Sequence, residues 1–208
     1  MTRTLLTLAL ALTAVLASAL DHAVAAPALR DGDLVFQTSR SAQGAAVAAA
    51  TGSPLTHMGV VLLDHGRPLV LEAVEPVRLT GLDEWRRRGE GGRLWVRRLR
   101  DADQVLTPAV VERLRALGRA WLGRHYDLQF RMDDDRLYCS ELAYKLYDRG
   151  AGIRLGRLQR AGDLALGSPE VRRRLRERFG PGGFDPEEPV ITPQSIFEDP
   201  RLATVVLP

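Results

Sequence analysis

Two runs of β-branched and apolar residues, joined by a short turn, are the feature that most constrains the fold of this 208-residue chain. The runs are residues 58–63 and 69–74, and Asp64-His65-Gly66-Arg67 lies between them. A two-residue turn at His65-Gly66 places Asp64 opposite Arg67, and opposite charges that face each other across a strand pair support this register. We therefore predict an antiparallel hairpin in which Asp64 pairs with Arg67.

The rest of the chain has strand signals early and helix signals mainly later. Residues 34–37 and 94–99 read as further strands. Apolar spacing predicts two longer helices, 108–122 with Thr107 as its N-cap and 137–149 with Gly150 as its stop. Shorter helices are expected at 42–51, 169–179 and 192–197. This pattern predicts a single α+β domain with an antiparallel sheet packed against helices.

The first 26 residues have the pattern of a secretion signal. Arg3 provides a positive start, residues 5–20 are apolar, and Ala23-Val24-Ala25 is a small-x-small cleavage site. The apolar stretch is short for a membrane span. We expect the domain at 27–208 to be secreted across the inner membrane, to the periplasm or the extracellular space. An uncleaved N-terminal anchor is the alternative.

The formal net charge of +3 comes almost entirely from arginine, since Lys145 is the only lysine. A mild positive excess is compatible with peripheral contact with an anionic envelope surface. No nucleic-acid motif accompanies it, so we expect no nucleic-acid partner. Arg86-Arg87-Arg88 and Arg172-Arg173-Arg174 are expected to be solvated faces, with contact to an anionic polymer or lipid head group as the alternative.

Cys139 is the only cysteine of the chain. An exported protein with one cysteine has no intramolecular disulfide partner for it, which suggests a reactive thiol or intermolecular pairing, with an inert buried thiol as the alternative. Cys139 falls near the start of the predicted helix 137–149. The helix dipole and the unpaired N–H groups there favour the thiolate and could hold an oxyanion. Glu141 opposes the thiolate if it lies near the sulfur.

A thiolate nucleophile needs a proton acceptor nearby, and His57 is the best placed of the four histidines. His22 belongs to the signal segment, His65 to the turn tip and His125 to a loop, whereas His57 opens an apolar strand.

The hairpin register places an acidic residue beside His57. In that register His57 faces Val74, and Glu72 projects from the same face one diagonal step away. Glu72 could then hold the tautomer of His57 and stabilise the imidazolium. A three-residue loop would shift the register and bring Glu75 opposite His57 instead. We prefer Glu72.

Six segments, in order, resemble the YiiX/YebB-like branch of the NlpC/P60 cysteine hydrolases, a circularly permuted papain-like group. Thr56-His57-Met58-Gly59 resembles the histidine strand, and Leu71-Glu72-Ala73 the acidic strand that follows it. Tyr138-Cys139-Ser140-Glu141-Leu142 resembles the nucleophile helix. The opening 31–36, the segment 123–130 and the closing 191–193 also match, so the resemblance spans nearly all of 31–206.

The resemblance implies a permuted papain-like fold and a catalytic set of Cys139, His57 and Glu72. It implies attack on an amide or related acyl bond, with a cell-wall peptide as the expected substrate. Tyr126, Tyr138 and Ser140 are weaker candidates for substrate binding or orientation, and each tyrosine could equally be a core aromatic.

Two other function classes stay open from the sequence. One is a thiol-dependent lipid or small-acyl esterase or acyltransferase, which apolar walls beside Cys139 would favour. The other is a non-catalytic envelope binding module that kept the fold. No metal or organic cofactor is implied, because Asp133-Asp134-Asp135 lacks the spacing of a calcium loop and reads as a polar loop.

Overall fold

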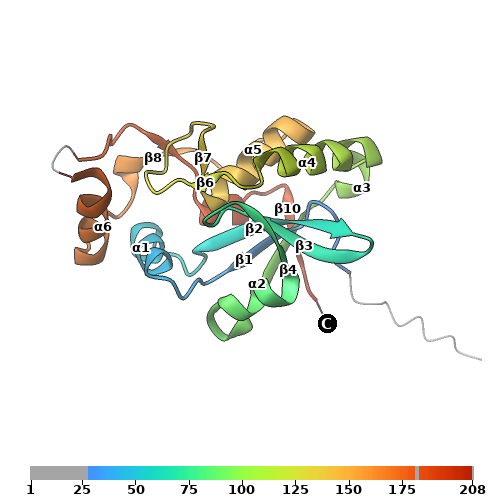
Figure 1. The fold of residues 1–208 in the computed structure, drawn as a ribbon, viewed down its shortest axis with the longest axis horizontal. Helices are drawn as coiled ribbons and strands as arrows, with labels where there is room; N and C mark the ends of the chain where they lie inside the picture. Colours follow the sequence, from blue (N-terminus) through green and yellow to red (C-terminus); the bar gives the residue numbers. More distant parts are fainter. Residues whose placement is uncertain (1–27, 181–182, 208) are drawn as a thin grey trace, which may run out of the picture.

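The computed structural model describes residues 28–180 and 183–207, and a six-stranded antiparallel sheet lies at its centre (Figure 1). The strand order is β10-β5-β1-β2-β3-β4. The strands are β1 Leu34–Gln37, β2 His57–Asp64, β3 Arg67–Glu72, β4 Arg78–Gly81, β5 Trp95–Leu99 and β10 Leu202–Val205. The strand pairs β6 (His125–Tyr126) with β7 (Arg136–Leu137), and β8 (Gln159–Arg160) with β9 (Pro189–Val190), lie outside this sheet.

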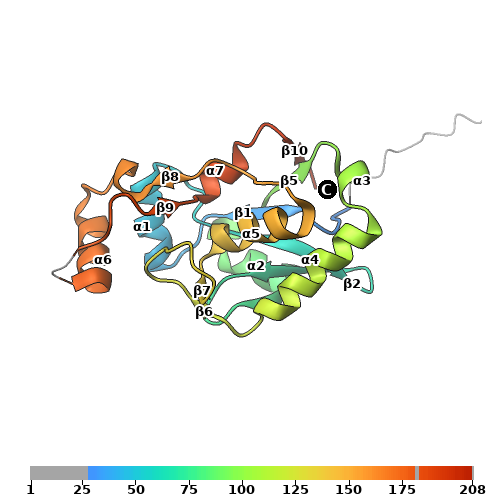
Figure 2. The same ribbon diagram turned by 90° about the horizontal axis from the view of Figure 1, so that it is seen from above.

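Helices cover both faces of the sheet. Figure 1 shows α4 and α5 on one face and α2 on the other, and Figure 2 shows α1 and α6 together at one end of the molecule. The helices are α1 Ala42–Thr51, α2 Leu82–Arg88, α3 Ala102–Val105, α4 Pro108–Trp121, α5 Cys139–Ala151, α6 Pro169–Phe179 and α7 Pro193–Phe197. The α+β architecture with an antiparallel sheet agrees with the sequence-based prediction.

Each inner strand sends alternate side chains to the two faces of the sheet, as strand geometry requires. On β2, Met58 and Val60 join the larger core under α4 and α5, whereas Val61 joins a smaller core around Trp85 of α2. Both faces of β2 are therefore buried, which explains its nearly continuous apolar sequence.

The predicted hairpin is confirmed. Asp64 pairs with Arg67 and Val60 with Leu71, so the turn at His65-Gly66 has two residues. Strand β3 ends at Glu72, two residues before the predicted end.

The predicted stop of the helix that contains Cys139 is wrong by two residues. Helix α5 ends at Ala151, and Gly152 is the left-handed C-cap with φ 72°. Gly150 lies inside α5, where its lack of a side chain accommodates Leu114 of α4: a Cβ on Gly150 would lie 2.4 Å from a methyl carbon of that leucine. By contrast, Thr107 caps α4 as expected, accepting a hydrogen bond from the amide of Val110.

Among the described residues, none of the helices has the length and apolar character needed to span a membrane. The predicted secretion signal, residues 1–26, lies outside the described residues.

Candidate active site

Cys139 is the first residue of α5, and its side chain is buried with the residue 5% exposed. Tyr138 precedes it in an extended conformation, and the backbone N–H of Tyr138 donates to Glu141 Oε2 at 3.0 Å. The carboxyl group of Glu141 therefore caps the helix start. This arrangement leaves the sulfur at the positive end of the α5 dipole, beside backbone N–H groups that have no partner within the helix.

His57 and Glu72 meet at adjacent ends of β2 and β3. His57 opens β2, Glu72 closes β3, and His57 Nε2 lies 2.6 Å from Glu72 Oε2. Because Nε2 is engaged by the carboxylate, Nδ1 is the ring nitrogen left for the Cys139 side chain, whose interaction with the imidazole raises the pKa of His57. The Cys139–His57–Glu72 chain thus has the connectivity of a nucleophile, a base and an orienting acid.

The electrostatics of this chain favour a charged imidazole. Burial alone would lower the pKa of His57, but hydrogen bonds with Cys139 and Glu72, together with the negative charges of both, raise it from 6.5 to about 9. Burial would raise the pKa of Glu72, but the hydrogen bond and charge of His57, with Thr80 and Arg88, lower it to about 2. An imidazolium bonded to a carboxylate is therefore the expected form at neutral pH.

The second oxygen of Glu72 is held by side chains from β4 and α2. The hydroxyl of Thr80 donates to Glu72 Oε1 at 2.6 Å, and Arg88 Nη2 donates to the same oxygen. Glu72 is 0% exposed, so a carboxylate there requires these donors. From the same helix, Trp85 stacks on His57 with ring centroids 5.9 Å apart. Helix α2 thus immobilises both members of the pair.

The expectation that Arg86, Arg87 and Arg88 form a solvated face is wrong for Arg88. Arg86 and Arg87 are exposed, but Arg88 is half-buried because the last turn of α2 points it at the Glu72 carboxylate. Sequence spacing alone had no signal for this contact, since the three arginines are identical and α2 has no apolar stripe.

We expect Arg88→Met to destabilise the fold by about 1 kcal/mol at pH 7 through loss of a charge-assisted hydrogen bond. Because the pKa of Glu72 is held below its usual value, its stabilisation is present above pH 4.5 and is lost as the pH falls toward 2. Without Arg88 the pKa of Glu72 should rise toward its usual value, so this acid loss should be smaller and should end at a higher pH. Urea unfolding between pH 3 and 7 measures it, with Arg86→Met as the matched control; identical profiles for the two variants would contradict the assignment.

Glu75, the alternative third residue, lies elsewhere. Its Oε1 is 2.7 Å from His125 Nδ1, and its Oε2 accepts from the backbone N–H of Tyr126 at 2.9 Å. Glu75 follows the end of β3, where the chain leaves the hairpin ladder, so the register argument no longer applies to it. The structure brings Glu72 to His57 and keeps Glu75 with the β6 segment.

The hydroxyls of two weaker candidates are occupied by one backbone unit. Tyr138 accepts a hydrogen bond from the N–H of Ile191 at 3.0 Å, and Ser140 donates to the carbonyl of Ile191 at 2.8 Å. These two residues tie the segment after β9 to the start of α5. Tyr126, the third candidate, is half-buried beside Cys139, and burial together with the charge of Cys139 raises its pKa.

A cavity of about 220 Å³ opens beside Cys139. We call it the Cys139 cavity, and its walls come from α1, α6, the 126–131 segment and the residues around β9. The walls are mainly apolar, with Ala46, Val47, Leu164, Val171, Leu175, Phe179, Phe184 and Val190 among them. A larger, polar hollow beside α7 includes neither Cys139 nor His57.

The polar loop 133–135 serves as an acceptor for cationic side chains of α5. Asp134 Oδ1 lies 2.9 Å from Lys145 Nζ and 2.7 Å from Arg149 Nη2. Lys145 also bonds Glu141 Oε1 at 2.7 Å, and burial raises the pKa of Glu141 to about 8 against the opposing effect of Lys145. The Glu141 side chain therefore bonds Lys145 and the Tyr138 amide. Its charge is offset by Lys145, so the sequence-based expectation that Glu141 could oppose the thiolate loses its main support.

Together these features define a papain-like cysteine hydrolase in which the histidine precedes the cysteine along the chain. The chain belongs to the family described as permuted papain-like amidase enzymes, YaeF/YiiX, C92 family, whose profile matches residues 28–206.

Among curated proteins, the chain is 38% identical over 174 residues to "Uncharacterized protein YiiX" of Escherichia coli strain K12, covering 84% of each chain. Among solved structures, it is similar to one described as metalloprotein yiiX from Escherichia coli O157:H7. That similarity has a TM-score of 0.80 and 37% identity, over 86% of this chain and 97% of that one.

That relative is described as a metalloprotein. Within residues 28–180 and 183–207, no group of three or more His, Cys, Asp or Glu side chains could hold a metal ion. The side chains of the candidate site also bond one another: both carboxylate oxygens of Glu72 and one nitrogen of His57 already have hydrogen-bond partners. The described residues therefore do not fit a bound metal.

Proposed function

We propose that this protein is an exported cysteine amidase in which Cys139 is the nucleophile, His57 the base and Glu72 the residue that orients His57. One observation carries the proposal: His57 is hydrogen-bonded to Glu72 and also interacts with Cys139, which lies at the N-terminus of α5. A binding module has no need of this connectivity.

The arrangement supports a two-stage reaction. The Cys139 sulfur attacks the carbonyl carbon, and backbone N–H groups at the start of α5 stabilise the oxyanion. The C–N bond then breaks, the amine leaves with the proton that His57 held, and an acyl-enzyme remains. His57 next takes a proton from water, the resulting hydroxide attacks the thioester, and release of the carboxylic acid restores the thiolate.

The cellular setting is part of the same proposal. The secretion pattern of residues 1–26 supports a periplasmic or extracellular enzyme, and the motif order supports membership of the wider NlpC/P60 superfamily. Helix α6 exposes Arg172, Arg173 and Arg176, which supports peripheral contact with an anionic envelope surface.

Two substrate classes follow from different observations. Export and family membership favour an amide of cell-wall peptide. The apolar walls of the Cys139 cavity favour an acyl chain on the carbonyl side of the scissile bond, since a cavity of this lining gains free energy from burying methylene groups. An amide whose acyl part is an apolar chain is therefore the second candidate substrate.

Mass spectrometry of the mature domain distinguishes the candidates. The protein is incubated separately with peptidoglycan stem peptides and with fatty-acyl anilides, and the intact mass is followed for an acyl adduct on Cys139. We expect an adduct from one class, and its mass identifies the acyl group. Absence of adduct and of product with both classes would favour the binding module.

A further inference from the structure

Two polar side chains in the wall of the Cys139 cavity are not fully compensated by their neighbours: one has an amide N–H group without an acceptor, and the other a positive charge without a carboxylate. Gln43, from α1, has its amide nitrogen Nε2 buried with no hydrogen-bond partner among the described residues. Its Oε1 is already used, since it accepts from Arg178 Nη2 on α6. A buried N–H without an acceptor destabilises a fold, so its presence in a cavity wall indicates a missing acceptor.

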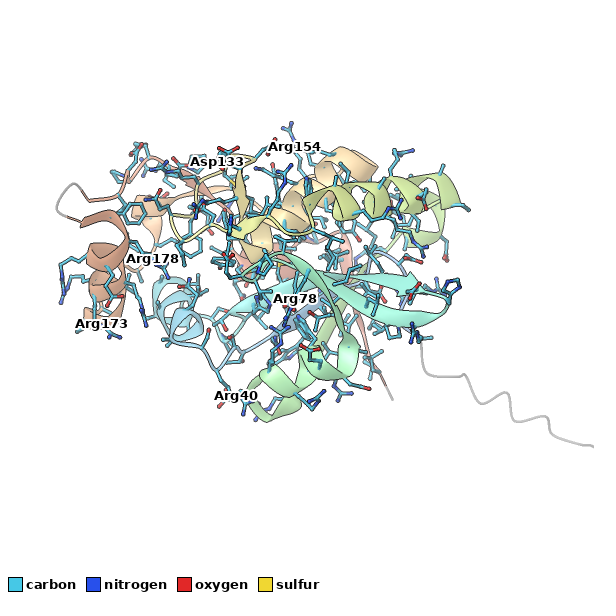
Figure 3. All side chains as sticks on the ribbon, in the orientation of Figure 1. Arg40, Arg78, Asp133, Arg154, Arg173 and Arg178 are labelled. Carbon is cyan, nitrogen blue, oxygen red and sulfur yellow. The ribbon has the colours of Figure 1, made fainter. Side chains whose placement is uncertain are left out.

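Arg178 is the second unbalanced group. It is half-buried, and its guanidinium lies over the ring of Phe130, 5.3 Å from the centroid. Burial and the neighbouring charge of Arg174 lower its pKa, and the charges of Glu177 and Asp127 offset this only in part. No carboxylate among the described side chains lies within ion-pairing distance of Arg178. Figure 3 shows Arg178 between α6 and α1, above the level of Arg173.

The acidic residues that line the same cavity are engaged locally. Asp185 accepts from the backbone N–H of Glu187 at 2.9 Å, and Glu188 accepts from the backbone N–H of Met132 at 3.2 Å. They do not neutralise Arg178. The end of the cavity between α1 and α6 therefore combines apolar walls with an uncompensated cation and a spare amide donor.

We infer that Arg178 and Gln43 form a subsite for an anionic group of the substrate, a carboxylate or a phosphate. This rests on the proposed function, because the subsite lies in the cavity that opens at Cys139. A half-buried guanidinium binds such oxyanions through paired hydrogen bonds, and Gln43 Nε2 supplies a further donor. The substrate is then an amide whose acyl part is apolar along its length and carries an anion away from the scissile bond.

Matched substrates test this specificity. The 4-nitroanilides of monocarboxylic acids with six to twelve carbons are compared with mono-4-nitroanilides of the dicarboxylic acids of equal length, and with phosphate-ended analogues. We expect the wild type to prefer an anionic member by at least about tenfold in kcat/KM at one or more lengths. Preference for the carboxylate or for the phosphate identifies the anion, and either supports the subsite.

Variants show which side chains cause the preference for anionic anilides, measured as the ratio of kcat/KM for the anionic and the uncharged anilide. Arg178→Met should reduce this ratio of kcat/KM values to less than about twofold, and Gln43→Met should reduce it by a smaller factor. Arg176→Met, an exposed position on the same helix, is the matched control and should retain the preference. A wild type without preference at every length, or an Arg178→Met variant that keeps it, would overturn the inference.

A binding measurement separates the subsite from catalysis. The same anilides are titrated calorimetrically into two proteins, the Cys139→Ala variant and the Cys139→Ala/Arg178→Met double variant. If the wild type forms no acyl-enzyme with any anilide, the proposed function fails, yet tighter binding of the anionic ligands that depends on Arg178 still supports the subsite. Binding that ignores Arg178 overturns the subsite even if hydrolysis occurs.

Discussion

Replacing Cys139 with alanine is expected to lower kcat/KM for amide hydrolysis by about 10⁴-fold or more, because no other nucleophile replaces the sulfur. The substitution removes one atom from a buried position at the start of α5, so the fold and the melting temperature should change little. The activity measurement uses whichever substrate forms the Cys139 adduct in the wild type.

The chain offers an internal control for this prediction. Cys139 is its only cysteine, so treatment of the wild type with iodoacetamide modifies a single thiol. The alkylated wild type and Cys139→Ala should lose activity to the same extent. Substantial residual hydrolysis in either preparation would mean that the sulfur is not the nucleophile.

Replacing His57 with glutamine is expected to slow the alkylation of Cys139 at pH 6 by at least about tenfold. The thiolate is the reacting form, and a neighbouring imidazolium favours it. Because the pKa of His57 is raised to about 9, the imidazolium is present throughout the range below that pH. The rate of iodoacetamide modification from pH 5 to 10 gives the profile. His65→Gln, at the exposed turn tip, is the control and should behave like the wild type.

The same raised pKa predicts how stability depends on pH. The folded-state pKa of His57 exceeds its usual value of 6.5, so the pair stabilises the fold fully below pH 6.5, and this contribution is lost as the pH rises toward 9. The stability difference between wild type and His57→Gln should therefore shrink over that interval. A difference that stays constant, with an unchanged alkylation profile, would rule out the Cys139–His57 pair.

The hairpin illustrates what local sequence can determine. The turn residues and the facing charges of Asp64 and Arg67 predicted its register, and the register placed Glu72 beside His57. This worked because a strand pair has a fixed geometry, so one correct pairing positions every other residue along it. The same reasoning stopped at Glu72, where the ladder ends, and Glu75 follows a different path.

Helix α2 illustrates the opposite case. Its seven residues have no apolar periodicity, so neither the helix nor strand β4 before it was predicted. Yet Trp85 stacks on His57, and Arg88 bonds Glu72. Contacts of this kind depend on where a short element crosses the sheet, and the spacing of residues along the chain carries no information about that.

The amino-acid sequence by itself determined the α+β class, the strands and helices with strong periodicity, the cysteine and histidine candidates and the acidic residue of the hairpin. These depend on local propensity, on turn geometry and on a motif order that needs no coordinates. Only the tertiary structure decided which arginine reaches Glu72, that Ile191 occupies the hydroxyls of Tyr138 and Ser140, and that α1 and α6 enclose an apolar cavity at Cys139. The physical reason is that each of these depends on side chains from segments distant in sequence, which only the packing of the whole domain brings together.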